Sequence, residues 1–434
     1  MIAPVTTIAD TKGLLGTLPS LRLDVPDYIY TATDNARCSK SEIFVKEGDH
    51  VYMGQLIGMR DGGFFKQPIH SSVSGIVDGF EEHYHRSGKK VKFVRVKNDH
   101  KDEWDPSLKP RSDEEIAKLT RADFSKILED CAMVGLGGSS FPTYVKFNND
   151  KKIEVILINA IECEPYITAD VRLMEEELEK TIEGMKYLMI AFECKKVLIC
   201  VKKKHKSLIK MYQEFLRRDE NKGISVCPVG NFYPQGWEIA MIKSALGIDI
   251  PSGHLPSEFG IANFNVSTVW GIYEAVKYNR PVVERFISVT GDGIRYPSNF
   301  RVRIGTPLKL LLDKCGGYTE PEKDKVFILG GPMMGASLPS DDCIITKTVT
   351  SVLVFNHVAA EEGPCIRCGS CVYSCPTHLE PKQIMDAVKA FDKERIKALN
   401  PLRCIECGLC TYVCTSHIRV TDYIRRAKMF AKTK

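Results

Sequence analysis

Residues 134–147 have the sequence VGLGGSSFPTYVKF and precede an apolar run, IEVILINA, at 153–160. The apolar run has the length and composition of a strand that is buried on both faces. The stretch before it holds Gly135, Gly137 and Gly138, and Lys146 lies near its end. Glycines let backbone N–H groups approach a phosphate, and a helix beginning after the loop would add a favourable dipole. The same glycines could instead only turn the chain between a helix and a strand.

Two acidic residues follow the apolar run. The sequence continues as IECEPY, which places Glu162 and Glu164 directly after the expected strand. Open α/β sheets bind their ligands in the crevice at the carboxyl ends of the strands. For each glutamate the alternative is a solvated carboxylate in a loop. The pattern favours an α/β domain with a ligand crevice at this point.

Length, charge and hydropathy exclude several classes of protein. A chain of 434 residues exceeds the size of one hydrophobic core and indicates two to four domains. A net charge of +5 is small for this length and gives no case for nucleic acid as a partner. The most apolar stretch, LMIAFECKKVLIC, is interrupted by Glu193, Lys195 and Lys196, and no basic region precedes an apolar core at the start. We expect a cytoplasmic protein that docks peripherally on the cytoplasmic face of the cell membrane.

Half of the 16 cysteines lie within 50 residues of the C-terminal region. They form two copies of C-x2-C-x2-C-x3-C, namely CIRCGSCVYSCP at 365–376 and CIECGLCTYVCT at 404–415. In this pattern three thiolates of one motif and the fourth of the other hold each [4Fe-4S] cluster. The predicted ligand sets are Cys365, Cys368, Cys371 and Cys414 for cluster 1, and Cys404, Cys407, Cys410 and Cys375 for cluster 2. Zinc is the alternative, but its structural sites usually pair two C-x2-C knuckles.

The segment between the two motifs has helical periodicity. It places Ile384, Val388 and Phe391 on one expected helical face, as in a helical ferredoxin domain with a long insert. Two clusters in one small module conduct single electrons. Such a module needs an electron source and an electron sink.

The motifs together resemble the C subunit of the Rnf complex, a membrane-bound, ion-translocating ferredoxin:NAD oxidoreductase. The resemblance extends from about Ile43 onward, in the order found in the family. It is carried by these motifs: GLGGSSFPTYVKF (135–147), NAIECEPYITADVR (159–172), YPQGWEIAMIKSALG (233–247), VTGDGIRYPSNFRVRIGTPLKLLLDKCGG (289–317), GGPMMG (330–335) and the two cysteine motifs. This resemblance implies an oxidoreductase component whose partners are other Rnf-type subunits, including a ferredoxin-like subunit and membrane subunits.

The central region is also similar to the flavin-bearing, NADH-oxidising subunit of respiratory complex I. That similarity implies an FMN and NAD(H) site formed by Gly135, Gly137, Gly138, Phe141, Lys146, Asn159, Glu162, Glu164, Tyr233, Gly236 and Glu238. Phe141 and Phe147 match aromatic positions near the nucleotide, with core packing as the alternative for both. Ser140, Ile161 and Trp237 depart from the complex I pattern.

The implied cofactors satisfy a chemical requirement. NADH gives up two electrons as a hydride, whereas an iron–sulfur cluster accepts one electron, so FMN has to stand between them. The cofactors carry the redox chemistry and the protein positions them. No catalytic acid or base is therefore assigned.

The expected fold is an α/β multidomain chain with four parts. Residues 1–115 resemble a barrel-sandwich β domain, without the lysine hairpin that carries a cofactor in lipoyl-type relatives. Residues 116–262 form the Rossmann-like FMN and NAD(H) domain, and 263–345 a β-grasp module of the SLBB type with a bracing role. Residues 346–434 form the α-helical ferredoxin domain.

Three functions are compatible with these features. The first is a peripheral subunit of an Rnf-type complex that passes electrons between NAD(H), FMN and two [4Fe-4S] clusters, while its partners translocate ions. The second is an NADH-dependent input subunit for a dedicated reductase of the proline- or cobalamin-reductase type. The third is an iron–sulfur wire and docking subunit with a degenerate flavin site.

Overall fold

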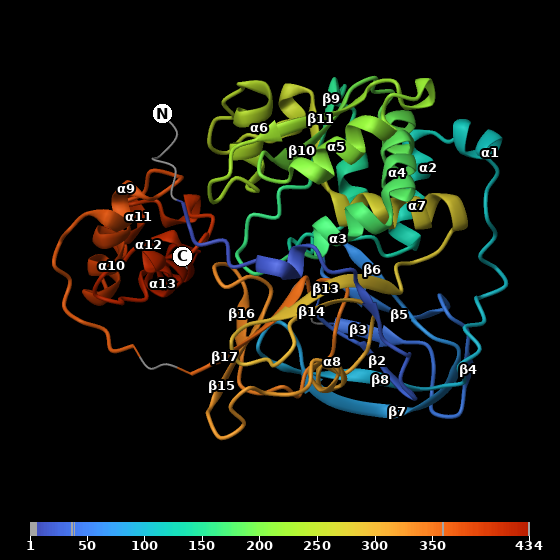
Figure 1. The fold of residues 1–434 in the computed structure, drawn as a ribbon, viewed down its shortest axis with the longest axis horizontal. Coiled ribbons are helices and arrows are strands. Elements are labelled where there is room, and N and C mark those ends of the chain that lie inside the picture. Colours follow the sequence, from blue (N-terminus) through green and yellow to red (C-terminus); the bar gives the residue numbers. More distant parts are fainter. Residues whose placement is uncertain (1–6, 36–37, 39, 358–359, 433–434) are drawn as a thin grey trace.

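The structure of the protein, a computed structural model, describes residues 7–35, 38, 40–357 and 360–432. Figure 1 shows an α/β domain above two β domains, with a helical C-terminal domain at one side. The chain segment before the first domain crosses the centre of the molecule and includes the 3-10 turn η1 (Gly13–Gly16). The four-part organisation expected from the sequence is confirmed.

The N-terminal β domain consists of two antiparallel sheets that face each other. One sheet has the order β2 (Tyr28–Ala32), β8 (Lys90–Asn98), β7 (Gly75–Tyr84), β4 (His50–Val51). The other has the order β3 (Lys40–Ile43), β5 (Leu56–Asp61), β6 (Lys66–His70). Branched side chains from both sheets, such as Ile29, Ile57 and Val96, are fully buried between them. This arrangement is the barrel sandwich that the sequence predicts.

The α/β domain is built on a parallel sheet with the order β11 (Ile224–Val229), β10 (Val197–Lys202), β9 (Val155–Asn159), β12 (Ile261–Asn265). One face of the sheet packs on α2 (Arg121–Asp130), α3 (Ala169–Glu176), α4 (Leu178–Ala191), α5 (Lys206–Phe215) and α7 (Val266–Tyr278). The other face packs on α6 (Glu238–Leu246). Strand β9 lies inside the sheet with helices on both sides, which explains its unbroken apolar sequence. A short helix, α1 (Asp113–Ala117), precedes the domain.

The β-grasp module is a six-stranded sheet that extends beyond the residues assigned to it. Its order is β1 (Leu21–Arg22), β14 (Ser298–Arg303), β13 (Glu284–Thr290), β17 (Ser351–Asn356), β15 (Lys325–Leu329), β16 (Ala336–Leu338), with α8 (Leu308–Lys314) packed on it. The predicted boundary at 262/263 falls inside β12, and the one at 345/346 separates β17 from the strands it pairs with. Both predicted positions need correction, because hydrogen-bonded strands belong to one folding unit.

The C-terminal domain is a small bundle of helices around the cysteine motifs. The helices are α9 (Ser370–Tyr373), α10 (Pro381–Lys389), α11 (Lys393–Ala398), α12 (Leu409–Tyr412) and α13 (Val420–Lys432). Ile384 and Val388 are buried as predicted, but Phe391 is 76% exposed. The prediction for Phe391 is wrong because α10 ends at Lys389 and Phe391 takes a positive φ, so the helical periodicity stops before it.

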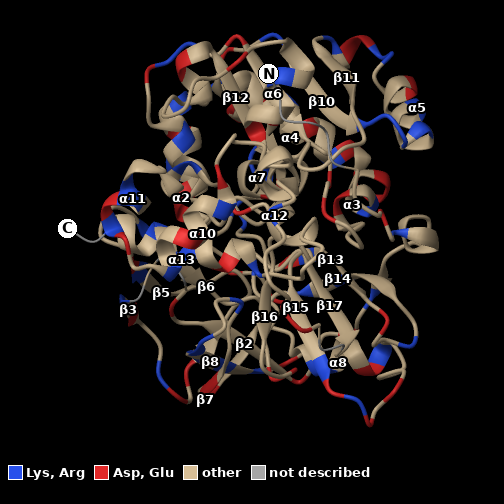
Figure 2. Cartoon of the chain, turned by 90° about the vertical axis from the view of Figure 1, so that its left-hand side faces the viewer, with Lys and Arg blue, Asp and Glu red and all other residues tan. Residues whose placement is uncertain are grey.

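Charge is mixed on the face of the molecule that carries this domain. Figure 2 shows basic and acidic residues interspersed over α10, α11 and α13. Arg425 and Lys428 of α13 both pair with Glu406. None of the helices in the described part of the chain combines the length and the apolar composition needed to cross a membrane.

The contact between α4 and α7 gives a test of the α/β core. A Cβ atom added at Gly184 of α4 would collide with the carbonyl oxygen of Val269 in α7. We expect Gly184→Ala to lower the free energy of unfolding by about 1–3 kcal/mol, although alanine favours helix, because the backbone of α7 has to move. Thermal unfolding, compared with Glu179→Ala at an exposed position of α4, measures the loss. A variant as stable as the wild type would contradict this packing.

Candidate functional site

The glycine loop lies against the N-terminus of α7. The amide of Leu136 donates to Oγ1 of Thr268 at 2.9 Å, and the amide of Gly135 donates to the carbonyl of Phe141 at 2.8 Å. A Cβ atom at Gly137 would lie 2.7 Å from Cγ of Asn265, the residue that caps α7. The close approach leaves no room for a side chain at Gly137. The loop and a helix N-terminus therefore meet here, which is the arrangement that favours phosphate binding.

This helix is not the one expected from the sequence. The residues directly after the loop form only a 3-10 turn, η2 (Thr143–Phe147). The helix whose N-terminus lies at the loop is α7, which begins only at Val266. Asn265, Ser267 and Thr268 were missed by the sequence analysis, although an asparagine at the end of a strand followed by a helix is a recognisable cap.

Four predicted residues gather at the carboxyl ends of the parallel strands. The Lys146 ammonium donates to the carbonyl of Asn263 at 2.6 Å, and the Asn263 amide donates to Glu238 at 3.0 Å. The Asn159 side chain donates to the carbonyl of Gly236 at 2.8 Å. Burial lowers the pKa of Lys146, and the charge of Glu238 opposes this shift. Two short networks thus hold residues from four separate segments at one end of the sheet.

Glu162 is a buried, paired carboxylate. Its Oε2 atom lies 3.5 Å from the ammonium of Lys12, and its Oε1 atom accepts from the amide of Asp170 at 2.8 Å. Asp170 in turn accepts from Asn265 at 2.7 Å and Ser267 at 2.5 Å. Burial raises the pKa of Glu162, and Lys12 opposes the rise. The solvated alternative is therefore wrong for Glu162. Lys12 lies 150 residues away in the chain, and nothing in the sequence marks it.

Glu164 and Tyr233 lie where the α/β domain meets the cysteine domain. Glu164 accepts from the amide of Met333 at 3.0 Å, and the Tyr233 hydroxyl lies 3.4 Å from its other oxygen. The same hydroxyl donates to the carbonyl of Cys407 at 2.8 Å. A side chain at Gly331 would collide with Glu164, so the GGPMMG segment closes over this carboxyl group. Burial raises the pKa of Glu164 to about 7.

The two phenylalanines have different surroundings. Phe147 is buried and packs against Phe192, with ring centroids 4.8 Å apart, and against Phe124 and Phe264. The structure thus supports the core-packing alternative for Phe147. Phe141 is only partly buried and remains at the loop.

The three positions that depart from the complex I pattern also differ in their surroundings. Ile161 is fully buried in the core beside α6. Ser140 faces Arg86 at 3.3 Å, and Trp237 precedes α6 at its N-terminus. Gly138, which shares the loop with Ser140, has a φ of +104°, a value that favours glycine.

The eight motif cysteines gather in the two predicted sets. Cys365, Cys368, Cys371 and Cys414 line one cavity of about 350 Å³, and Cys375, Cys404, Cys407 and Cys410 line a second, smaller one. Each set combines three thiols of one motif with the last thiol of the other. Four thiols that line one cavity provide the number and type of ligands that a [4Fe-4S] cluster needs. In the second set the amides of Leu379 and Glu406 lie 3.3 Å from the sulfurs of Cys375 and Cys404, where they would stabilise thiolates.

The two sets differ in their exposure. Cys365 and Cys368 are exposed, and the neighbouring Ile366 and Tyr373 are 66% and 70% exposed. Cys407 is buried in a small apolar cluster with Tyr233 and Leu409. We call the first set the outer cysteines and the second set the inner cysteines. The inner set adjoins the α/β domain through Cys407, and the outer set reaches solvent through Cys365 and Cys368.

Family models match four parts of the chain. They are an RnfC barrel sandwich hybrid domain at residues 8–101, a Nuo51 FMN-binding domain at 128–274, an SLBB domain at 286–337 and a 4Fe-4S dicluster domain at 364–418. The FMN-binding match includes both the glycine loop and the cap of α7. The dicluster match includes all eight motif cysteines.

Curated relatives match most of the chain. It is 36% identical over 79% of its length to the C subunit of the Na(+)-translocating ferredoxin:NAD(+) oxidoreductase complex of Acetobacterium woodii, covering 77% of that protein. It is 33% identical over 86% of its length to the C subunit of the proton-translocating ferredoxin:NAD(+) oxidoreductase complex of Clostridium ljungdahlii, covering 81%. The C subunit of the ion-translocating oxidoreductase complex of Rhodobacter capsulatus is 34% identical, with 82% of this chain and 69% of that protein covered.

Solved structures show the same fold at low identity. An NAD+-reducing [NiFe]-hydrogenase matches in the H2-reduced state with a TM-score of 0.50 and 14% identity, and in the air-oxidized state with 0.51 and 16%. The matches cover 73% and 72% of this chain. The chain spans 61% and 65% of the length of those two chains.

The raised pKa of Glu164 gives a pH-dependent test. The folded protein holds this carboxyl protonated up to about pH 7, whereas the unfolded chain releases the proton near pH 4.5. Its contribution to stability is therefore complete below pH 4.5 and is lost as the pH rises to 7. Relative to Glu164→Gln, the wild type should lose up to about 3 kcal/mol of unfolding free energy over that window.

Thermal unfolding of both proteins from about pH 4.5 to about pH 8 measures this difference. Glu179→Gln, at an exposed position of α4, is the matched control for the removal of a carboxylate. A constant difference between the wild type and Glu164→Gln would contradict the raised pKa, because it would show that folding does not change the pKa of Glu164.

Proposed function

This chain belongs to the RnfC family, the C subunits of ion-translocating ferredoxin:NAD(+) oxidoreductase complexes, and we propose that it is the peripheral electron-transfer subunit of such a complex. It is an oxidoreductase component that uses FMN, two [4Fe-4S] clusters and NAD(H). The observation that carries the proposal is the seating of the glycine loop on the N-terminus of α7, in a domain that directly contacts the inner cysteines.

The residues around the loop fit FMN. Gly137 packs so closely against Asn265 that a Cβ atom would collide with it, and Thr268 fixes the loop there. Backbone N–H groups of the loop and of α7 would hold the phosphate, with Lys146 as the nearby cation. When bound, FMN supplies the exchange between two-electron and one-electron chemistry. The chain's own residues position it and exclude water.

Glu164 and Tyr233 have a positioning role in this proposal. Their contacts fix the carbonyl of Cys407, and thereby the inner cysteines, against the α/β domain. Asn159 fixes Gly236 over the same end of the sheet, where Cys163 lies against Gly236. The distance between the two domains thus depends on side chains that do not themselves change redox state.

The cysteines hold the clusters in a defined order. The inner cysteines hold the cluster next to the α/β domain, and the outer cysteines hold the cluster at the exposed end. An exposed cluster beside Ile366 and Tyr373 is suited to exchange electrons with a partner protein. We assign that surface to a ferredoxin-like subunit, and ion translocation to membrane subunits that bind this chain at the cytoplasmic face.

Two other functions use parts of the same site. An input subunit for a dedicated reductase would keep all these residues and differ only in its partner. A flavin-less wire would not need a glycine loop packed on a helix N-terminus, and the intact contact of the loop with Asn265 and Thr268 favours the flavoprotein.

The proposed function is tested by anaerobic spectroscopy. We expect the purified chain to contain about eight irons, the content of two [4Fe-4S] clusters, and FMN. Addition of NADH should bleach the flavin and then the cluster absorbance, and NADPH in parallel tests the nucleotide preference. A full iron content without flavin, and no response to NADH after FMN is added, would leave only the wire.

Gly137→Ala tests the flavin site. The added methyl group forces Asn265 out of place at a cost of about 1–3 kcal/mol, so FMN affinity should fall by about tenfold or more. Flavin fluorescence measures the bound fraction, and iron content should not change. Gly16→Ala is the matched control, because its Cβ meets only a methyl group at 3.6 Å. Unchanged FMN affinity would place the flavin elsewhere.

Cys375→Ser and Cys414→Ser test the two ligand sets. Cys375 belongs to the first motif but completes the inner set, and Cys414 belongs to the second motif but completes the outer set. Each variant therefore lacks one ligand of one cluster and should lose about half of the iron. NADH should still reduce the cluster that remains in Cys414→Ser, but not the one in Cys375→Ser, because only the inner cysteines adjoin the α/β domain. Cys315→Ser, at a buried thiol of the β-grasp module, is the control. The opposite NADH responses would reverse the proposed order.

A further inference from the structure

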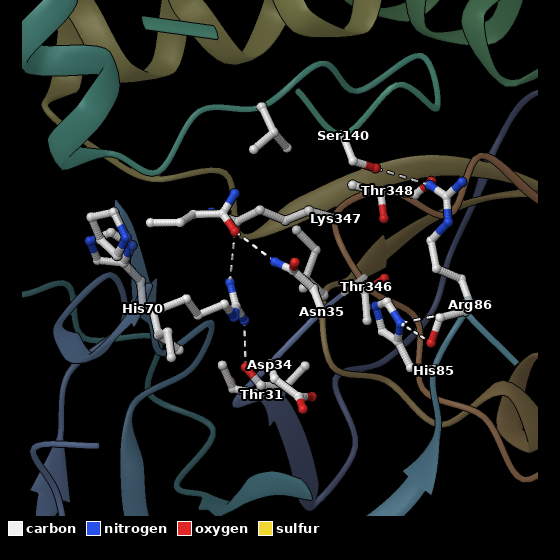
Figure 3. Close-up of a pocket in the computed structure, with 18 of the residues that line it drawn as sticks. Thr31, Asp34, Asn35, His70, His85, Arg86, Ser140, Thr346, Lys347 and Thr348 are labelled. Carbon is white, nitrogen blue, oxygen red and sulfur yellow. Dashed lines mark hydrogen bonds between the residues drawn. The ribbon is translucent and has the colours of Figure 1, made fainter. Parts of the chain in front are cut away.

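A cavity distinct from the two cysteine-lined cavities lies beside the glycine loop, on a side away from α7. It has a volume of about 510 Å³ and is bounded by the barrel-sandwich domain, the loop and the segment 346–348. Figure 3 shows Asn35, His85, Arg86, Thr346 and Lys347 around it, with Ser140 of the loop facing Arg86. Gly138, one of the glycines assigned to the flavin and nucleotide site, lines this cavity, whereas Gly137, Asn265 and Lys146 are not among its described lining residues. The cavity therefore borders the proposed flavin site across the glycine loop.

The lining of this cavity is basic. Arg60, Arg86 and Lys347 contribute three cations, and Asp34 is the only acidic residue among the described lining residues. In the part of the chain that the structure describes, neither Arg60 nor Lys347 forms an ion pair. Both side chains are half-buried at the cavity wall, and charges held away from bulk water are normally paired, because an unpaired charge there costs free energy. Within these described residues, the chain thus places Arg60 and Lys347 here without an anion paired to either.

Lys347 forms fewer hydrogen bonds than Arg60. Its ammonium makes one long hydrogen bond, 3.4 Å to the carbonyl of Ala132, although an ammonium has three donors. Arg60 donates to the carbonyls of Thr33 and Ala32 and faces Gln67. Burial, together with the charge of Arg60, lowers the pKa of Lys347 to about 8. An anion between the two side chains would relieve both effects.

The remaining lining suits an organic phosphate. Hydroxyl and amide donors surround the cations: Gln67, Ser139, Ser140, Thr346 and Thr348. Ile69, Val134 and Ile304 form apolar walls. The volume lies within the range of small-molecule sites, about 300–1,000 Å³, and exceeds what a bare ion would need. Phosphate matches the lining better than a carboxylate does, because it offers more acceptor oxygens and more charge to several donors at once.

We propose that this cavity binds a small phosphate-bearing anion of mononucleotide size, with its phosphate between Arg60 and Lys347. Such a ligand would contact the barrel-sandwich domain, the glycine loop and the segment 346–348 together. It would therefore hold the loop in place from the side away from α7. The proposal does not depend on flavin binding or on electron transfer.

Calorimetric titration of the full chain tests this site. The probes are AMP, inorganic phosphate and adenosine, added anaerobically in the presence of excess FMN and NAD+ so that the flavin and nucleotide sites are filled. We expect one saturable AMP site and binding of adenosine at least about tenfold weaker, because adenosine lacks the charge-assisted contacts. Tighter binding of AMP than of phosphate would identify a phosphate ester as the ligand, and equal binding would identify free phosphate; either supports an anion site.

Lys347→Met and Lys66→Met form a matched pair. Lys66 lies at the exposed start of β6, next to the lining residue Gln67, so its loss should leave AMP affinity unchanged. Lys347→Met should weaken AMP by about tenfold or more, with iron and flavin content retained. If the methionine variant does not fold, Lys347→Gln replaces it, and the comparison of AMP with adenosine on the wild type needs no variant.

Two results would overturn the proposal. One is the absence of saturable binding of AMP and phosphate to the wild type. The other is AMP binding at a different site. Excess FMN and NAD+ would then abolish the binding, or the Lys347→Gln and Lys347→Met variants would bind AMP as tightly as the wild type.

Discussion

The candidate site depends on one contact, the seating of the glycine loop on the N-terminus of α7. The amide of Leu136 binds Thr268, and Gly137 approaches Asn265 so closely that no side chain fits between them. This contact brings backbone N–H groups of the loop and the positive end of a helix to one place. The surrounding side chains then organise around it: Asp170 is held by Asn265 and Ser267, and Glu162 is held by Asp170 and Lys12.

The second determining feature is the joint between the α/β domain and the cysteine domain. A buried tyrosine hydroxyl donates to the carbonyl of Cys407, and a buried carboxyl group beside it accepts from the GGPMMG segment. Buried polar groups of this kind are stable only when they are hydrogen-bonded, so they fix the domains in one relative position. Electron transfer between cofactors requires a short and constant separation. The joint supplies this without any residue that takes part in the redox chemistry.

The glycine loop serves two surfaces at once. Gly137 faces α7, whereas Gly138, Ser139 and Ser140 line the basic cavity next to the barrel-sandwich domain. This domain therefore does more than cover the outside of the molecule, since Arg86 extends from it to the loop and Arg60 lines the same cavity. The α/β domain lies above the two β domains in Figure 1, and residues of all three units line this cavity.

The sequence by itself determined the features that depend on local spacing. The two cysteine motifs predicted both thiol sets, because three ligands lie on one short loop and the fourth on the following turn. The apolar run at 153–160 predicted the central strand, and the glycines predicted a loop whose backbone can be approached closely, as Asn265 approaches Gly137. Phe391 shows the limit of this reasoning, because the helical periodicity of the sequence continues past the end of α10.

Only the tertiary structure decided which distant segments meet. Lys12, Thr268 and Asn265 are distant in sequence from the residues that they contact in the folded protein. The composition of residues 143–147 did not distinguish the 3-10 turn η2 from the expected helix. Two predicted domain boundaries differ from the structure because the strands at 261–265 and 351–356 pair with strands that are distant in the sequence. Such pairing is a long-range interaction that local sequence does not show. The charge of Lys347 is costly only because burial removes the water that would otherwise solvate it. Spacing encodes local chemistry, whereas burial and pairing are properties of the folded chain.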